Sequence, residues 1–118
     1  MQIERYETGK RMSQAVSYGG FVFLAGQVAI DAPGTSVREQ TANILARITR
    51  LLERAGSNST RILSATIWLA DMSGFDEMNA VWDAWAPSGN TPARATVEAR
   101  LAAPQFSVEI GIIAAAGN

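Results

Sequence analysis

Three features of the chain predict an α+β two-layer sandwich: the order of its segments, one long amphipathic helix, and too few helices to cover both faces of a sheet. The segments follow the order strands, helix, strand, helix, strand, strand, within 118 residues that we assign to a single domain, residues 1–118. Two helices cover one sheet face. We therefore expect the chain to bury the other face by associating with copies of itself in a closed, symmetric oligomer.

The N-terminal part is expected to supply strands. Residues 1–8 form a short edge strand, and the polar stretch GKRMSQAV, residues 9–16, is expected to be a loop. The stretch YGGFVFLAGQVAI, residues 18–30, is typical of two strands or one bent strand, with its adjacent glycines in the turn. Gly26 indicates a β-bulge or a close approach to the backbone, and Gln27 is expected to be buried and hydrogen-bonded within the sheet.

Residues 36–55 carry the clearest helical signal in the chain. Ser36 is followed three positions later by Glu39, which is the capping-box pattern, and Gly56 stands where a helix end favours a left-handed residue. The expected buried face repeats at helical spacing. Its members are Val37, Thr41, Ile44, Leu45, Ile48, Leu51, Leu52 and Ala55.

The C-terminal half predicts three strands and a second helix. RILSATIWLAD, residues 61–71, is apolar and β-branched, as strands buried on both faces are. Ser73 is expected to cap the helix that follows, which ends at Pro87. Residues 93–101 and 106–115 then alternate in character, as strands with two unlike faces do. The expected buried stripe of the second helix is Phe75, Met78, Trp82 and Trp85.

Composition excludes several chemistries. The chain has no His and no Cys, which rules out an imidazole base, a thiolate nucleophile and metal sites built on these ligands. A formal net charge of -1 and a single lysine, Lys10, argue against a nucleic-acid partner. The charged start MQIERYETGK is unlike a signal peptide, and no apolar run reaches the length of a membrane span. We expect a cytoplasmic protein without a membrane partner.

Glu109 stands in the apolar stretch SVEIGIIAAAG, residues 107–117, where an ionised carboxylate is costly unless something pairs with it or uses it. Gly111 lies on the same strand face and is expected to leave an open space beside the carboxylate. A carboxylate beside a cavity indicates a binding or catalytic site. The plainer alternative is a surface carboxylate on an edge strand.

Arg94 lies near the start of the alternating stretch 93–101, on the face that also carries Thr96 and Glu98. A planar guanidinium binds carboxylates through two parallel hydrogen bonds, so Arg94 is a candidate for holding an anionic ligand in one cleft with Glu109. A salt bridge from Arg94 to either glutamate, or a solvated strand end, fits the sequence equally well.

Several segments follow one another in a specific order: RMSQAV, FLAGQVAID, EQTANILARITRLLERAGS, ATIWLADMSGFDEMNAVWDAW, TPARATVEARL and VEIGIIA. This ordered set extends over essentially the whole chain and resembles the RidA family, also called the YjgF or L-PSP endoribonuclease-like family. No single motif carries the resemblance. The residues around MNAVWDAW resemble a less characterised branch of this family rather than its archetypal enzymes.

The resemblance implies a chorismate-mutase-like two-layer sandwich, with one mixed sheet covered by two helices and a homotrimer with small-molecule clefts between subunits. It also implies hydrolysis of reactive enamines and imines, such as 2-aminoacrylate, to a 2-keto acid and ammonia, with no metal and no cofactor. The implied catalytic residues are Arg94 of the PAR motif, which holds the substrate carboxylate, and Glu109 of VEI, which orients a water. Gly26, Thr96 and Asn79 are implied to line the cleft.

Two positions depart from the family pattern. Met12 stands where archetypal members carry a tyrosine before SQA, and Ala25 stands where they usually carry a serine before GQ. Both changes make the cleft less polar, and a Met-lined pocket suits a larger or more apolar imine than 2-aminoacrylate. The first expectation is therefore a deaminase for small imines that carry a carboxylate. One alternative is a non-catalytic, ligand-sensing or chaperone-like trimer, which the two replacements favour. A ribonuclease is disfavoured by the missing His and the near-neutral charge.

Overall fold

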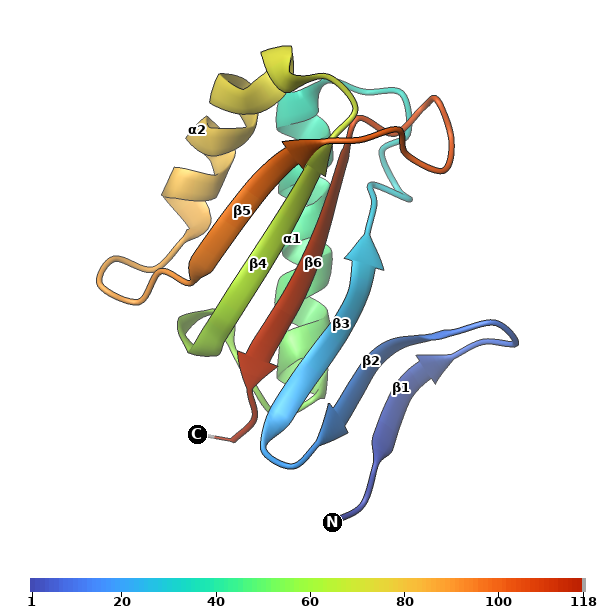
Figure 1. Cartoon of the computed structure of the whole chain (residues 1–118), viewed down its shortest axis with the longest axis vertical. Helices are drawn as coiled ribbons and strands as arrows, with labels where there is room; N and C mark the ends of the chain where they lie inside the picture. Colours follow the sequence, from blue (N-terminus) through green and yellow to red (C-terminus); the bar gives the residue numbers. More distant parts are fainter. Residues whose placement is uncertain (118) are drawn as a thin grey trace.

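The computed structural model describes residues 1–117, which form a six-stranded mixed sheet with two helices on one face (Figure 1). The last residue of the expected domain 1–118 lies outside the described residues. The strands are β1 (Glu4–Thr8), β2 (Ser13–Tyr18), β3 (Phe21–Gln27), β4 (Ile62–Leu69), β5 (Ala93–Glu98) and β6 (Val108–Ala115). The helices are α1 (Val37–Arg54) and α2 (Phe75–Trp85), with 3₁₀ turns η1 (Ser59–Arg61) before β4 and η2 (Met72–Gly74) before α2. The expected α+β class, mixed sheet and one-sided helical cover are confirmed.

The strand order is β1-β2-β3-β6-β4-β5, so the last strand of the chain lies between β3 and β4. β4 and β5 are parallel and every other neighbouring pair is antiparallel. Parallel neighbours need a crossover connection, and α2 supplies it between β4 and β5. Because β5 is the last strand in this order, it is an edge strand of the sheet.

Within residues 1–117, neither helix combines the length and the apolar character that crossing a membrane requires.

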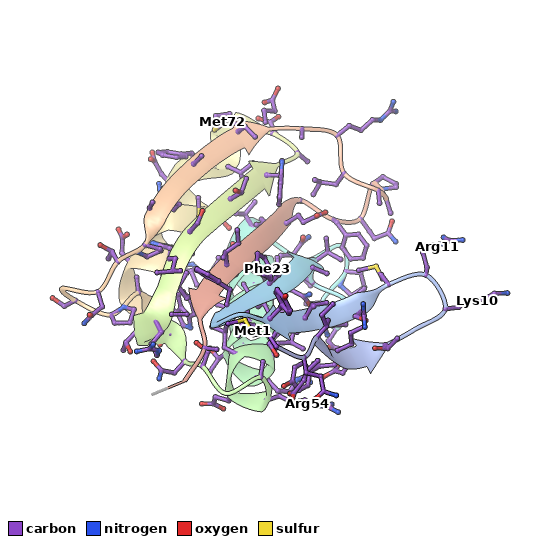
Figure 2. All side chains as sticks on the ribbon, turned by 60° about the horizontal axis from the view of Figure 1, so that its bottom comes forward. Met1, Lys10, Arg11, Phe23, Arg54 and Met72 are labelled. Carbon is purple, nitrogen blue, oxygen red and sulfur yellow. The ribbon has the colours of Figure 1, made fainter. Side chains whose placement is uncertain are left out.

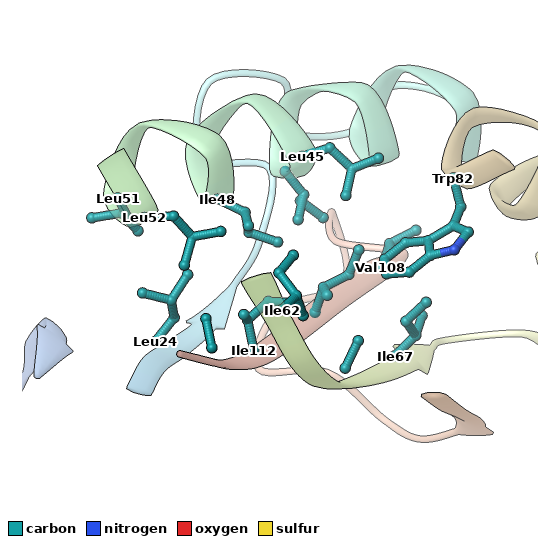
Figure 3. Close-up of a cluster of buried hydrophobic side chains, with 14 of the residues drawn as sticks. Leu24, Leu45, Ile48, Leu51, Leu52, Ile62, Ile67, Trp82, Val108 and Ile112 are labelled. Atoms are coloured by element: carbon teal, nitrogen blue, oxygen red, sulfur yellow. The ribbon is translucent and has the colours of Figure 1, made fainter. Parts of the chain in front are cut away.

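Helix α1 begins where the capping pattern predicts. The Ser36 hydroxyl oxygen accepts a hydrogen bond from the Glu39 backbone N–H at 3.1 Å, and Gly56 after the helix has φ +82°. The buried face of α1 packs on the apolar side of β3, β4 and β6 (Figure 3). Figure 3 shows Leu45, Ile48 and Leu52 of the helix directed toward side chains of the sheet. The predicted helix and its core face are confirmed.

The core side of α1 contains one amide, Gln40, that the apolar spacing of the helix does not predict. Gln40 is fully buried, and its Nε2 donates to the carbonyl oxygens of Thr35 at 2.9 Å and Gln105 at 3.1 Å. Its Oε1 accepts a hydrogen bond from the Ser107 backbone N–H at 2.8 Å. Because both ends of the amide are paired, its burial is compensated, and it joins the start of α1 to the segment that leads into β6.

Two expectations about strands are wrong. The polar stretch expected to be a loop contains β2, which pairs with β1 on one side and β3 on the other. Backbone pairing with a strand on each side stabilises β2, although its sequence SQAVSY mixes polar and apolar residues. β4 is buried on one face, where Ala65 and Ile67 pack beneath the helices, whereas Thr66 and Trp68 on its other face are half-buried.

The start of α2 also differs from the expectation. Its N-cap is Gly74, which provides no side-chain cap, and Ser73 belongs to η2, where its backbone N–H donates to Asp71 Oδ1 at 2.8 Å. The short polar segment therefore closes a 3₁₀ turn before the helix begins. Of the expected stripe, Trp82 is buried together with Met78, but Phe75 is 38% exposed.

The sheet face opposite the helices, called the open face below, is apolar and exposed. Phe21 and Phe23 of β3 are 45% and 43% exposed, and Ile113 of β6 is 38% exposed on the same face. Figure 2 labels Phe23 in the full set of side chains, together with Lys10 and Arg11 at the tip of the β1–β2 hairpin. The prediction that two helices leave one face uncovered is confirmed.

Candidate functional site

Glu109 lies on the open face, in the middle of the sheet. It belongs to β6, and its register partner on β4 is Trp68. Its carboxylate reaches the backbone of Gly26 on β3: a Cβ at Gly26 would lie 3.0 Å from Glu109 Cδ and closer still to Oε2. A side chain at position 26 would therefore occupy the space of the carboxylate. The structure brings Glu109 and Gly26 together, as the sequence predicts for a close approach.

Gly26 lies in a β-bulge. The register between β3 and β6 shifts between Leu24 and Gln27, so that two residues of β3 face one residue of β6. Gly26 does not adopt a left-handed conformation, unlike several other glycines of residues 1–117. Position 26 therefore requires glycine because any side chain there would take the space of Glu109, and not because of the backbone conformation.

The open space expected at Gly111 is occupied. The Trp68 indole lies on this glycine, with Cζ3 and Cη2 both 3.3 Å from the position of a Cβ. A larger residue at position 111 would lift the ring off the sheet. The expected gap is therefore wrong, and an indole beside Glu109 is found instead. Sequence reasoning missed Trp68 because its proximity to Glu109 depends on the β4–β6 register, for which the linear pattern gives no signal.

Glu109 has no ionic partner within the described residues 1–117. The ion pairs within residues 1–117 join Arg47 to Asp31, and Arg50 and Arg54 to Glu7. Neither suggested salt bridge of Arg94, to Glu98 or to Glu109, is among them. Burial raises the pKa of Glu109 above its ordinary value, because the charged form loses solvation without gaining a cation. Glu109 is thus a half-buried carboxylate that holds its proton more tightly than a solvated one.

Arg94 points to the other side of the sheet. On the parallel β4–β5 ladder it is the partner of Ala65, which is buried beneath the helices. The Arg94 Cζ lies 5.3 Å from the centroid of the Trp82 ring of α2, at cation–π distance. Within one chain, Arg94 and Glu109 therefore lie on opposite faces and do not share a cleft.

Two further predicted residues lie on the side of Arg94. Thr96 is the partner of Ile67 on the helix-covered face, and Asn79 belongs to α2. Thr96 Oγ1 and Asn79 Oδ1 are buried and have no hydrogen-bond partner within residues 1–117. Buried polar atoms without a partner are uncommon in native proteins and often indicate a functional region. We call Arg94, Thr96 and Asn79 the edge group.

The remaining predicted residues lie around Gly26. Met12 is 47% exposed and lines, together with Gly26, a hollow of about 210 Å³ at the start of β2 and the end of β3. Gln27 is buried, and its Nε2 donates to the Ala25 carbonyl oxygen at 3.0 Å, as expected for a residue that hydrogen-bonds within the sheet. We call Glu109, Gly26 and Met12 the open-face group. The part of the chain that the structure describes has no group of three or more His, Cys, Asp or Glu residues placed to hold a metal ion.

Comparisons with known proteins are consistent over the whole chain. The family model described as Endoribonuclease L-PSP matches residues 2–116. The RutC family protein YoaB of Escherichia coli K12 is 44% identical over 116 residues, which cover 98% of this chain and 99% of that protein. A YjgF family protein of Neisseria meningitidis has a structure with a TM-score of 0.96 and 47% identity, covering 100% of this chain and 98% of that chain. A Rid family protein of unknown function, YyfA of Yersinia pestis, has a TM-score of 0.85 and 26% identity, covering 92% of this chain and 90% of that chain.

Proposed function

Because this chain belongs to the YjgF/L-PSP family, we propose that it hydrolyses reactive 2-imino acids to 2-keto acids and ammonia, as a homotrimer with clefts between subunits. The observation that carries the proposal is the state of Glu109. It is a half-buried carboxylate with a raised pKa and no ionic partner within residues 1–117, set against the backbone of Gly26. Carboxylates in such surroundings are suited to accepting and returning protons.

The proposed cleft combines the open-face group of one copy with the edge group of another. Arg94 and Glu109 lie on opposite faces of the sheet, so one chain alone does not supply both. Arg94 belongs to the edge strand β5, which lies at the margin of the sheet. A second copy that covers the apolar open face can bring its own margin, and with it Arg94, to the rim of the region that holds Glu109.

In the proposed reaction, Arg94 holds the substrate carboxylate and Glu109 positions a water against the imine carbon. The water oxygen bonds to that carbon while one of its protons passes through Glu109 to the imine nitrogen, which gives a carbinolamine. The proton of the carbinolamine hydroxyl then passes through Glu109 to the same nitrogen, the C–N bond breaks, and ammonia leaves as the C=O bond forms. The sum is imine plus water giving a 2-keto acid plus ammonia, with no change in oxidation state.

The side chains near Glu109 support an apolar substrate group. Trp68 is the neighbour of Glu109 across the β4–β6 ladder, and Met12 lines the hollow that borders Gly26. Trp68 contributes a rigid ring that is largely apolar, and Met12 a flexible apolar chain. We therefore propose imines with aliphatic or aromatic side chains as better substrates than 2-aminoacrylate.

The activity is tested by generating 2-imino acids in situ with an amino-acid oxidase and trapping the surviving imine with semicarbazide. Wild-type protein is expected to lower the trapped yield, whereas Arg94→Gln and Glu109→Gln are each expected to leave it unchanged. Equal trapped yields with wild type and without protein, across several amino acids, would reject the proposal.

Mixing the two inactive variants tests the shared cleft. If Arg94 and Glu109 of one cleft come from different chains, co-refolding Arg94→Gln with Glu109→Gln forms some clefts in which both residues are wild type. A fraction of the wild-type activity is then expected to return. Recovery would not occur if each cleft took both residues from one chain. In analytical ultracentrifugation, the wild-type protein is expected to sediment with the mass of a trimer.

A non-catalytic ligand-binding trimer is the second candidate. Met12 and Ala25 favour it, because they bring neither a phenol nor a hydroxyl to the proposed cleft. It predicts binding of 2-keto acids without any effect on the trapped imine. A ribonuclease has less support, since the chain offers no His and a single lysine to meet the phosphates. RNA digestion with a chelator control tests that third possibility.

A further inference from the structure

A chain of three polar side chains runs from α1 to β2 across the end of β3. Arg47 Nε donates to Gln27 Oε1 at 3.2 Å, and Gln27 Nε2 donates to Gln14 Oε1 at 2.9 Å. Gln27 is only 1% exposed, and the Arg47 side chain is 19% exposed. These three residues are among those that line the hollow of about 210 Å³.

The direction of this hydrogen-bond chain is fixed by Arg47. A guanidinium is a donor only, so the Gln27 atom facing Arg47 must be the amide oxygen. The Gln27 amide nitrogen then faces Gln14 and the Ala25 carbonyl, which requires the Gln14 oxygen to be the acceptor. Gln14 is left with its NH₂ group, which donates to no partner within residues 1–117. The chain therefore ends in unused donors at the hollow.

Arg47 also keeps spare donors. Its second interaction is with Asp31, through Nη1 at 3.4 Å, and the Asp31 side chain is 69% exposed. An ion pair this long and this exposed is weak, and it occupies few of the five N–H groups of the guanidinium. Asp31 is a carboxylate that a better-placed carboxylate can replace.

The rest of the lining is apolar. Met12, Val28 and Ile30 line the hollow beside the polar chain, and Met12 and Ile30 are 47% and 54% exposed. The volume is smaller than the roughly 300–1,000 Å³ of sites for drug-sized ligands. Spare donors and apolar side chains that line one small hollow suit a short aliphatic carboxylate.

We infer that this hollow binds a small aliphatic carboxylate, with the oxygens on Arg47 and Gln14 and the hydrocarbon part against Met12, Val28 and Ile30. The site is built within one chain and uses a different guanidinium from Arg94. It adjoins the proposed cleft at Gly26 and Met12, but it does not depend on imine hydrolysis. A protein without deaminase activity would bind the carboxylate equally well.

The test is a titration of the uniformly ¹⁵N-labelled full chain with sodium propanoate, followed by NMR. Propanoate is expected to shift the side-chain NH₂ signals of Gln14 and Gln27 with a dissociation constant on the order of 1 mM. Propanamide, which has the same shape without the charge, is expected to leave them in place. Sodium chloride at equal ionic strength controls for salt.

Two variants separate this site from others. Gln14→Glu keeps an acceptor for Gln27 but replaces the NH₂ donors by a negative charge, and Arg47→Gln removes the cation. Each is expected to weaken propanoate binding at least about tenfold. Gln105→Glu makes the same change of charge at an exposed side chain outside the hollow and is expected to bind as wild type does.

Arg94→Gln distinguishes the inference from the proposed function. It is expected to leave the propanoate shifts at Gln14 and Gln27 intact even if it abolishes imine hydrolysis. The inference is overturned if propanoate does not bind saturably, if its shifts surround Arg94 instead, or if folded Gln14→Glu binds it like the wild type. The proposed function survives each of these results.

Discussion

A methyl group added at Gly26 tests the role of the glycine that faces Glu109. In Gly26→Ala, the new Cβ would lie 3.0 Å from Glu109 Cδ and 3.3 Å from Cγ, and it would overlap Oε2. The carboxylate must move by about 1 Å to make room, and a misplacement of that size costs roughly 100-fold in rate. We therefore expect the imine-hydrolysis rate to fall by about that factor.

The same substitution is expected to leave the fold nearly as stable as before. An off-rotamer glutamate costs about 0.5–1.5 kcal/mol, while alanine in a strand is favoured over glycine by about 0.5–1 kcal/mol. The clashing atoms belong to the end of a flexible side chain and not to the backbone. The expected change in the free energy of unfolding is thus below about 1 kcal/mol in either direction.

Urea unfolding and the semicarbazide trap, applied to one preparation, measure both quantities. Gly9→Ala is the control, because its added methyl group makes only an ordinary contact, 3.5 Å from the Met12 carbonyl oxygen, and does not meet Glu109. A stable Gly26→Ala protein with the wild-type rate would refute the assignment of Glu109. A protein unfolded by the methyl group would refute the steric account of position 26.

Three further changes have expected outcomes. Burial raises the pKa of Glu109, which means that the folded state disfavours the charged carboxylate. The wild type is therefore expected to lose stability relative to Glu109→Gln as the pH rises above 4.5, the ordinary pKa of a glutamate. Urea unfolding at a series of pH values measures this difference. Glu7 behaves oppositely: its hydrogen bond from Arg50 lowers its pKa, so the stability that wild type holds over Glu7→Gln is lost as pH falls below 4.5, in the same titration. Ser36→Ala removes the acceptor for the Glu39 N–H and is expected to lower the free energy of unfolding by about 1 kcal/mol, measured at neutral pH.

The sequence predicts an element correctly where the residues that stabilise it lie within the element itself. Helix α1 has a cap at Ser36, a stripe of apolar residues and a glycine at its end, and all three act within the helix itself. The bulge at Gly26 is similarly local. β2 was missed because its stability comes from two neighbouring strands, and its own residues resemble those of a polar loop.

The sequence proposes the candidate residues one by one, but it does not give their arrangement. Alternation correctly separates the two faces of β5 and of β6, yet nothing in it says that the Arg94 face of one strand is opposite to the Glu109 face of the other. That relation is set by the order and register of strands brought together by folding. The same register places Trp68 over Gly111, so an apparent gap in the sequence is filled by a distant residue.

The buried Gln40 amide links two connections that are far apart in the chain. Its three hydrogen bonds hold the carbonyls of Thr35 and Gln105 and the amide of Ser107, so neither connection can open alone without stranding a polar atom away from water. The entry to α1 and the entry to β6 are therefore expected to open as one cooperative unit. The hydrogen-exchange rate of the Ser107 amide would then report the local opening of the helix start around Gln40, which lies 67 residues earlier in the chain.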